Sequence, residues 1–195
     1  MPLKSLAEYE LLAEQAHGHL CAGQILGLRM ALCGLRLLGL EDPAGADRQR
    51  LVTFAETDRC ATDAIAVVTG CRLGKRTLKF RDFGKVAATF CDLRRDRAVR
   101  IAARESPGQR AGEMHAEIPD RKQRQMRACR ELPDAELFDI QWVRVKLAPK
   151  DVPGYKAPRA VCAECGEGVG FGREVLRDGR VVCRACAGDR YYEPL

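Results

Sequence analysis

Four cysteines near the end of the chain constrain its folding more than any other feature. Cys162 pairs with Cys165 and Cys183 pairs with Cys186, with seventeen residues between the two pairs. Two such thiolate pairs can close a tetrahedron around zinc, because each short turn directs two sulfur atoms toward one point. We predict a structural zinc site with no open position for catalysis. The same ligands would also accept iron, as in rubredoxin, or work as a redox dithiol.

The residues around these pairs predict the form of the zinc-binding unit. Gly166 and Gly168 follow the first pair, where a tight turn is needed. Residues 187–192 could form a short terminal helix, which favours a treble-clef or ribbon-like finger. Such fingers bind nucleic acid, dock proteins or only stabilise a fold, so the finger does not identify a function.

The rest of the chain is long enough to form a core without help from the metal. A chain of 195 residues corresponds to one domain of ordinary size with a small appendage, at roughly 100–200 residues per domain. Three prolines between positions 149 and 158 indicate a stiff linker, after which the composition changes. We therefore predict a core domain over residues 1–150, a Pro-rich linker over 151–160 and a four-cysteine finger over 161–195.

Helix and strand patterns alternate along the core, which is typical of an α+β domain. The segment from Ser106 to Glu117 has the composition of a loop, and we expect His115 to be solvated there. The predicted helices span residues 3–16, 24–38, 60–69 and 119–131, and the predicted strands span 51–55, 77–80, 86–90, 98–102 and 140–147.

The net charge of +6 comes from one region of the chain. Between Arg94 and Arg130, eleven Lys and Arg residues face five acidic residues, and the rest of the chain is balanced. The basic helix expected at 119–131 has no interleaved aromatic residues on which bases could stack. We interpret it as a solvated face, and we do not expect a nucleic-acid partner from it.

Two features predict a cytoplasmic protein with reduced cysteines. The first residues have no uninterrupted apolar segment of the signal-peptide kind. The apolar run from Ile25 to Leu40 contains Arg29 and Arg36, which lie seven residues apart on one helical face, so it predicts a core helix and not a membrane span. Three cysteines without partners in the sequence are interpreted as packing residues: Cys33, Cys91 and Cys129.

A second group of candidate metal ligands lies near the start of the chain. Three of them lie within five residues just before the helix predicted at 24–38: His17, His19 and Cys21. The fourth is Cys60, the first residue of the helix predicted at 60–69, and Asp63 follows it by one turn. Nitrogen and sulfur donors in this number can hold a metal with an open, catalytic position. In the alternative reading the histidines are caps or core residues and the cysteines are small buried hydrophobes.

Four motifs in this order resemble the FmdE family, which is named for a subunit of molybdenum formylmethanofuran dehydrogenase. The resemblance covers about residues 10–147, and the finger is similar to the auxiliary zinc finger of many members. One departure is Ala22, where the family usually has proline after the cysteine. The motifs are His17-Gly-His19-Leu-Cys21-Ala-Gly23, Cys60-Ala-Thr-Asp63-Ala-Ile65, Gly70-Cys71-Arg-Leu-Gly74-Lys75 and Asp82-Phe-Gly84-Lys85-Val-Ala87.

The resemblance implies an α+β core that forms a homodimer and has a metal-binding cleft. Its ligands would be His17 or His19 together with Cys21 and Cys60, and the metal would be a second divalent ion, expected to be zinc. Asp63, Cys71 and Lys75 would line the cleft, with Asp63 as a proton carrier and Lys75 as the anchor for a small anionic ligand.

Three functions remain open at this point. The resemblance implies an enzyme or enzyme subunit of one-carbon, molybdenum- or tungsten-linked redox metabolism, an oxidoreductase with partner dehydrogenase subunits. The alternatives are a non-catalytic protein that binds or delivers metal in the same cleft, and a zinc-finger adaptor that contacts nucleic acid or protein.

Overall fold

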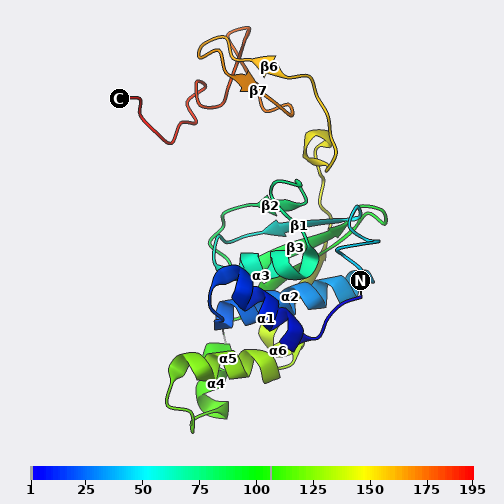
Figure 1. The fold of residues 1–195 in the computed structure, drawn as a ribbon, viewed down its shortest axis with the longest axis vertical. Coiled ribbons are helices and arrows are strands. Elements are labelled where there is room, and N and C mark those ends of the chain that lie inside the picture. Colours follow the sequence, from blue (N-terminus) through cyan, green and yellow to red (C-terminus); the bar gives the residue numbers. More distant parts are fainter. Residues whose placement is uncertain (1, 106) are drawn as a thin grey trace. The chain divides into compact units, whose positions relative to one another are not determined.

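The core contains a five-stranded sheet with its helices packed on one face. The structure is a computed structural model that describes residues 2–105 and 107–195 (Figure 1). The strand order is β2-β1-β3-β4-β5, in which β1 and β2 are parallel and the other neighbours antiparallel. The strands are β1 (Leu51–Ala55), β2 (Leu78–Phe80), β3 (Ala87–Asp92), β4 (Arg97–Ala103) and β5 (Phe138–Val143).

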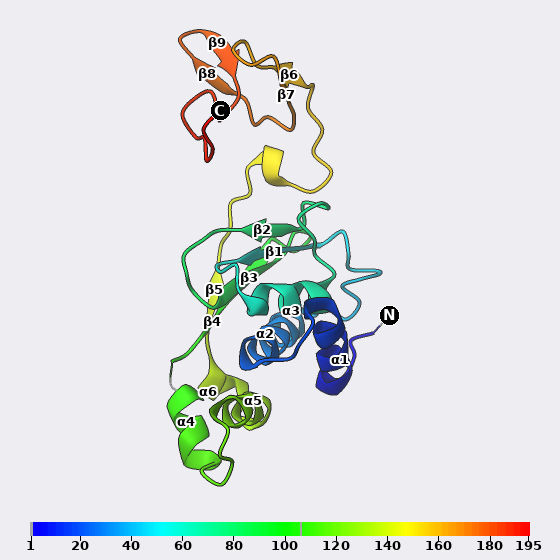
Figure 2. The ribbon, with the colours of Figure 1, turned by 60° about the vertical axis from the view of Figure 1, so that its left-hand side comes forward.

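Two helices pack on the sheet and the others pack around them (Figure 2). Helix α3 connects the parallel strands β1 and β2, which a short turn could not join. Helices α4 and α5 pack on each other, and α5 also contacts α2. The helices are α1 (Leu6–His17), α2 (Ala22–Leu38), α3 (Cys60–Thr69), α4 (Pro107–Met114), α5 (Arg121–Glu131) and α6 (Asp134–Leu137).

Close contact between α2 and its neighbours depends on two glycines. A Cβ atom on Gly27 would lie 2.4 Å from the carbonyl oxygen of Ala61, and one on Gly34 would lie 2.4 Å from the Phe90 ring. Both distances are too short for real atoms, so a side chain at either position would push α2 away. The missing Cβ of Gly27 therefore brings the start of α3 against α2.

The predicted polar face of α2 has a structural role. Arg29 and Arg36 both bind the carboxylate of Asp134, at 2.6 and 2.8 Å. Arg29 also donates to the carbonyl oxygens of Cys129 and Arg130, which lie in the last turn of α5 and lack helical partners. The two arginines share a face as predicted, and they attach α2 to the end of α5.

The chain forms a second compact unit over residues 146–195, after a first unit over 1–145. A 3-10 turn (Pro149–Asp151) is followed by two short hairpins. Residues 187–195 contain a turn and a bend but no helix, so the short terminal helix expected after Cys186 is wrong and the unit is ribbon-like. The hairpins consist of β6 (Ala160–Val161) with β7 (Gly168–Val169) and β8 (Val175–Arg177) with β9 (Arg180–Val182).

The α+β class is confirmed, and the segment at 106–117 differs from its prediction. The predicted loop at 106–117 contains α4, and His115 is only 5% exposed where we expected it in solvent. Packing of Ala111 and Ala128 between α4 and α5 outweighs the low helix propensity of Pro and Gly in this segment. Ser106 itself lies outside the described residues. Within the described ranges no helix is long and apolar enough for a membrane span.

Candidate metal centres

The four finger cysteines come together as the sequence predicts. Their Sγ atoms all lie within 4.8 Å of one another, and those of Cys165 and Cys183 are 3.9 Å apart. Four sulfurs at the usual Zn–S distance form a tetrahedron with edges of about 3.8 Å. The cluster therefore fits zinc without rearrangement of the chain.

The backbone around the finger favours a thiolate at Cys162. Backbone N–H groups of Cys165, Cys183 and Glu164 lower the pKa of Cys162 to about 6. A hydrogen bond with Cys183, together with burial, raises the pKa of Cys186 to about 12. The negative charge of the Cys162 thiolate also raises the pKa of Cys186, because the sulfurs crowd one point. A divalent cation is needed to keep all four ionised, which is the chemistry of a structural zinc site.

The candidate ligands of the core lie at three helix ends that meet. His17 is the last residue of α1, Cys21 is the N-cap of α2 and Cys60 is the first residue of α3. Gly18, with φ of 91°, ends α1 in a left-handed turn and lets the chain reverse into the next helix. Chain reversal at Gly18 and the close approach of α3 to α2 together place these residues in one region.

The two histidines are close to each other and to Asp63. Nδ1 of His17 lies 2.8 Å from Oδ2 of Asp63, and the His17 and His19 ring centroids are 4.9 Å apart. A carboxylate that accepts from one ring nitrogen fixes the tautomer and leaves the other nitrogen free for a metal. In this geometry Asp63 orients a histidine, a role that the sequence did not indicate.

Cys21 and Cys60 form a second pair. Burial raises the pKa of the Cys60 thiol, and its hydrogen bond with Cys21 raises it further. A Cβ atom on Gly23 would lie 3.7 Å from both Cys21 Sγ and Cys60 Cβ, so both cysteines lie beside this glycine. Within residues 2–105 and 107–195, the finger cysteines are the one group of three or more potential ligands gathered closely enough for a metal. The candidate donors of the core lie instead in two separate pairs, His17 with His19 and Cys21 with Cys60.

A cavity of about 460 Å³ opens beside this region, and we call it the donor-loop pocket. One wall is the loop that carries His19 and Cys21, and the other wall is α5. The sequence assigned α5 to solvent, so the contribution of this helix was missed. Its signal was the helical spacing of the α5 residues that line the pocket, Lys122, Gln125 and Met126.

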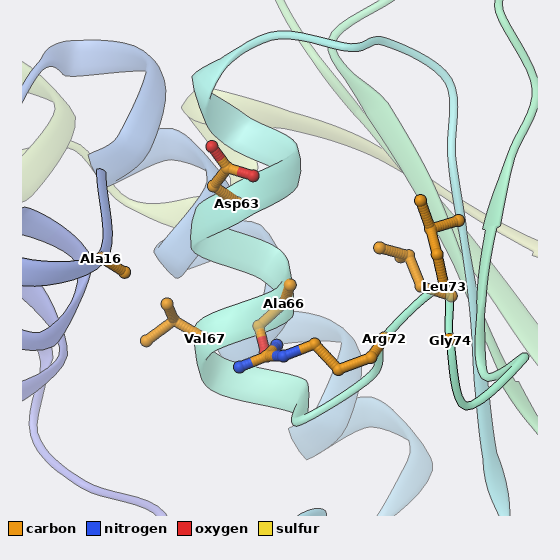
Figure 3. A pocket seen from close by; sticks show the side chains of 8 residues that line it. Ala16, Asp63, Ala66, Val67, Arg72, Leu73 and Gly74 are labelled. Atoms are coloured by element: carbon orange, nitrogen blue, oxygen red, sulfur yellow. The ribbon is translucent and has the colours of Figure 1, made fainter.

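A second cavity of about 470 Å³, the α3 pocket, lies on the Asp63 side (Figure 3). Its cationic group is Arg72, which donates to the carbonyl oxygens of Ala66 and Cys71 at 2.5 and 3.0 Å. Lys75, the expected anion anchor, is exposed and does not line this pocket. Cys71 is buried in the core with its sulfur 3.5 Å from Thr53 Oγ1.

The three remaining cysteines are packing residues, as predicted. Cys33, Cys91 and Cys129 are each no more than 5% exposed. Burial raises the pKa of Cys91 to about 12, and that of Cys33 and of Cys129 to about 11. These thiols stay protonated at neutral pH, so they are poor metal ligands and poor nucleophiles.

An α+β core joined to a four-cysteine unit defines a metal-binding protein with a zinc finger. A family described as "FmdE, Molybdenum formylmethanofuran dehydrogenase operon" matches residues 16–139, and the prokaryotic dksA/traR C4-type zinc finger matches residues 157–192. The first match covers more than half of the chain. The chain therefore belongs to the FmdE family.

Two known proteins are similar to the chain over most of its length. A probable S-adenosyl-L-methionine-binding protein of Archaeoglobus fulgidus is 28% identical over 210 residues, which cover 97% of this chain and 55% of that protein. The chain thus spans about half the length of this relative. The crystal structure of a tungsten formylmethanofuran dehydrogenase FmdE-like protein from Syntrophus aciditrophicus has a TM-score of 0.65 at 20% identity. The match covers 99% of this chain and 100% of that one, and it confirms the fold.

Proposed function

We propose that this FmdE-family protein binds a second divalent metal, expected to be zinc, where the ends of α1, α2 and α3 meet. The observation that carries the proposal is the placement of an oriented imidazole and a thiol pair at three adjoining helix ends. His17 or His19 would supply nitrogen, and Cys21 and Cys60 would supply sulfur. Side-chain rotations at these half-buried helix ends would be needed to bring both pairs onto one ion.

The donor set fits a catalytic site better than a closed structural one. Two thiolates and one imidazole leave a fourth position on zinc open. A metal there would polarise an oxygen of a bound ligand or lower the pKa of a bound water. Asp63 would hold His17 in the required tautomer, and the donor-loop pocket would admit a small molecule to the open position.

On this basis we propose an enzyme or enzyme subunit of one-carbon, molybdenum- or tungsten-linked redox metabolism. Support comes from membership of the FmdE family, and the expected oxidoreductase activity, cytoplasmic location, homodimer and partner dehydrogenase subunits belong to this proposal. The name of the Archaeoglobus relative offers S-adenosyl-L-methionine binding as a second candidate. The donor-loop pocket, at about 460 Å³, is within the size range of small-molecule sites, which is about 300–1,000 Å³.

The charges of the finger do not favour the nucleic-acid adaptor. Three of its arginines bind carboxylates of the same unit, so their charge is largely neutralised locally. The pairs are Arg173 with Asp151, Arg177 with Glu164 and Arg184 with Asp189.

Metal content per chain tests the proposal. Wild-type protein should carry two equivalents, and Cys60→Ala should carry one with an intact finger. Cys91→Ala is the matched control, because it removes a buried thiol outside the site and should keep both metals. One equivalent in wild type and in Cys60→Ala alike would remove the basis for the core metal and for its chemistry.

A further inference from the structure

We propose that the donor-loop pocket binds a small molecule with an anionic end, a carboxylate or a phosphate, and that Lys122 is the anchor for this charge. The other end of the molecule would reach Cys21 and His19. The inference rests on the proposed function, because it places the ligand beside the core metal donors.

One face of α5 leads from solvent to the donors. Three residues share a helical face with Lys122, because they lie three, four and seven positions after it: Gln125, Met126 and Cys129. Exposure falls along this face, because Lys122 is exposed, Gln125 and Met126 are half-buried, and Cys129 is 4% exposed. The first three line the pocket together with Cys21. A ligand that enters along α5 therefore passes Lys122 first.

The charge of Lys122 is available to a ligand. In the second half of α5 the cations are paired, since Arg127 binds Glu131 and Arg130 binds Glu10 at 2.8 and 2.9 Å. Within the described part of the chain, the side chain of Lys122 has no ion pair or hydrogen bond. It also lies in the first turn of α5, where a cation opposes the helix dipole. Arg121 and Arg124 also lie at the start of α5, and Lys122 differs from both because it lines the pocket.

The walls of the pocket define the rest of the ligand. Leu20, Ala22 and Met126 are apolar, and they lie in the same pocket as Lys122 and the donors. The Gln125 amide can accept or donate a hydrogen bond there. The pocket thus suits a molecule with an apolar middle, an anionic end at Lys122 and a metal-binding or thiol-reactive end at Cys21.

Alkylation of Cys21 by a charged and an uncharged reagent measures how strongly Lys122 attracts an anion into the pocket. Iodoacetate and iodoacetamide attack the same thiolate, form the same S–C bond and release iodide, but only iodoacetate carries a carboxylate. Mass spectrometry of the Cys21 peptide gives the ratio of the two rates. Lys122→Gln should lower the iodoacetate-to-iodoacetamide ratio about two- to fivefold, the range of an exposed ion pair. The iodoacetamide rate alone should stay the same, which shows that the pocket is still folded.

Arg124→Gln is the matched control. It removes the same charge from the same helix, but Arg124 does not line the pocket, so the ratio should keep its wild-type value. Protection of Cys21 from iodoacetamide by succinate would identify a carboxylate site, and protection by inorganic phosphate would identify a phosphate site. The proposal would be overturned if the iodoacetate-to-iodoacetamide ratio fell equally in Lys122→Gln and Arg124→Gln, or did not fall in Lys122→Gln. It would also be overturned if neither anion protected Cys21.

This test is independent of the core metal. A metal on Cys21 would slow both reagents, because both need the free thiolate, and its charge would act equally in Lys122→Gln and Arg124→Gln. The comparison of the ratio between these two variants therefore does not depend on the metal. Failure of the anion site therefore appears in the ratio, and failure of the proposed function appears in the metal content.

Discussion

Nδ1 of His17 lies 2.8 Å from Oδ2 of Asp63, across a separation of 46 residues in the chain. The imidazole is 20% exposed and the carboxylate 61% exposed, so solvent weakens their attraction. The contact therefore contributes little to folding. Its main effect is to fix the ring of a candidate metal ligand.

Asp63→Ala should weaken zinc binding in the core about 10- to 100-fold, the usual effect of losing the carboxylate that orients a histidine ligand. Competition with a chromogenic chelator would measure this affinity. Asp58→Ala is the control, because Asp58 is also exposed and precedes the same helix. The finger zinc should be retained in both variants. Equal core affinity in the two variants would show that Asp63 does not orient a ligand.

Gly27→Ala should destabilise the core by about 1–3 kcal/mol, the usual cost of overpacking. The new Cβ would lie 2.4 Å from the Ala61 carbonyl oxygen, so α2 and α3 must separate. The separation would also move Cys21 from Cys60 and reduce core metal binding. Thermal unfolding and metal content would check both effects.

Gly112→Ala in α4 is the companion variant, because no atom lies within 4 Å of the added Cβ. It should be neutral or stabilising, by about 1 kcal/mol at most. If Gly27→Ala were as stable as this variant, the close approach of the two helices would not matter.

Asp92 should make the core sensitive to acid. Burial alone would raise the pKa of Asp92, but hydrogen bonds from Arg50 and from the backbone of Arg94 and Arg95 outweigh it and lower the pKa below its usual value. A lowered pKa stabilises the fold above the unfolded value of about 3.9. That stability is lost as the pH falls through the pKa of the folded state.

Asp92→Asn should therefore cost about 2 kcal/mol at pH 7, because it removes the 2.5 Å carboxylate partner of Arg50 and leaves Asp47 as the other partner, at 2.6 Å. The difference from wild type should shrink as the pH falls below about 4. Urea unfolding of both proteins between pH 7 and pH 3 would measure it. A difference independent of pH would show that the ion pair is not its cause.

Removal of zinc should unfold the finger and leave the core folded. The second unit has short hairpins and little buried surface, with Cys162 and Val182 as its buried hydrophobic residues among those described. Metal binding is then a large part of its folding free energy. After treatment with a strong chelator, hydrogen exchange should rise over residues 160–186 and stay slow in α2 and β3. Cys162→Ser should reproduce this pattern without the chelator, and slow exchange in the finger of this variant would contradict the account.

Local patterns predicted most of the fold. Strand β1 and helix α3 have the predicted bounds. The end of the helix was predictable because Gly70, a glycine suited to a left-handed turn, follows its last residue. The finger was equally predictable, since all its ligands lie in two short turns. Contacts distant in sequence were not predictable. The sequence could not show that α5 contacts the loop of His19 and Cys21, about a hundred residues earlier.

The same limit explains the error at His115 and the unforeseen contact of Asp63. His115 is buried because α4 and α5 pack together, a tertiary effect that outweighs the loop-like composition. The contact of Asp63 with His17 depends on the angle between α1 and α3, which no local pattern encodes. The core metal itself stays a prediction.

Anomalous diffraction at the zinc edge, from crystals grown with zinc and no chelator, tests the central claim most directly. We predict two peaks per chain, one among the four finger cysteines and one bound by Cys21, Cys60 and either His17 or His19. A single peak at the finger, with Cys21 and Cys60 free in the same map, would contradict the account.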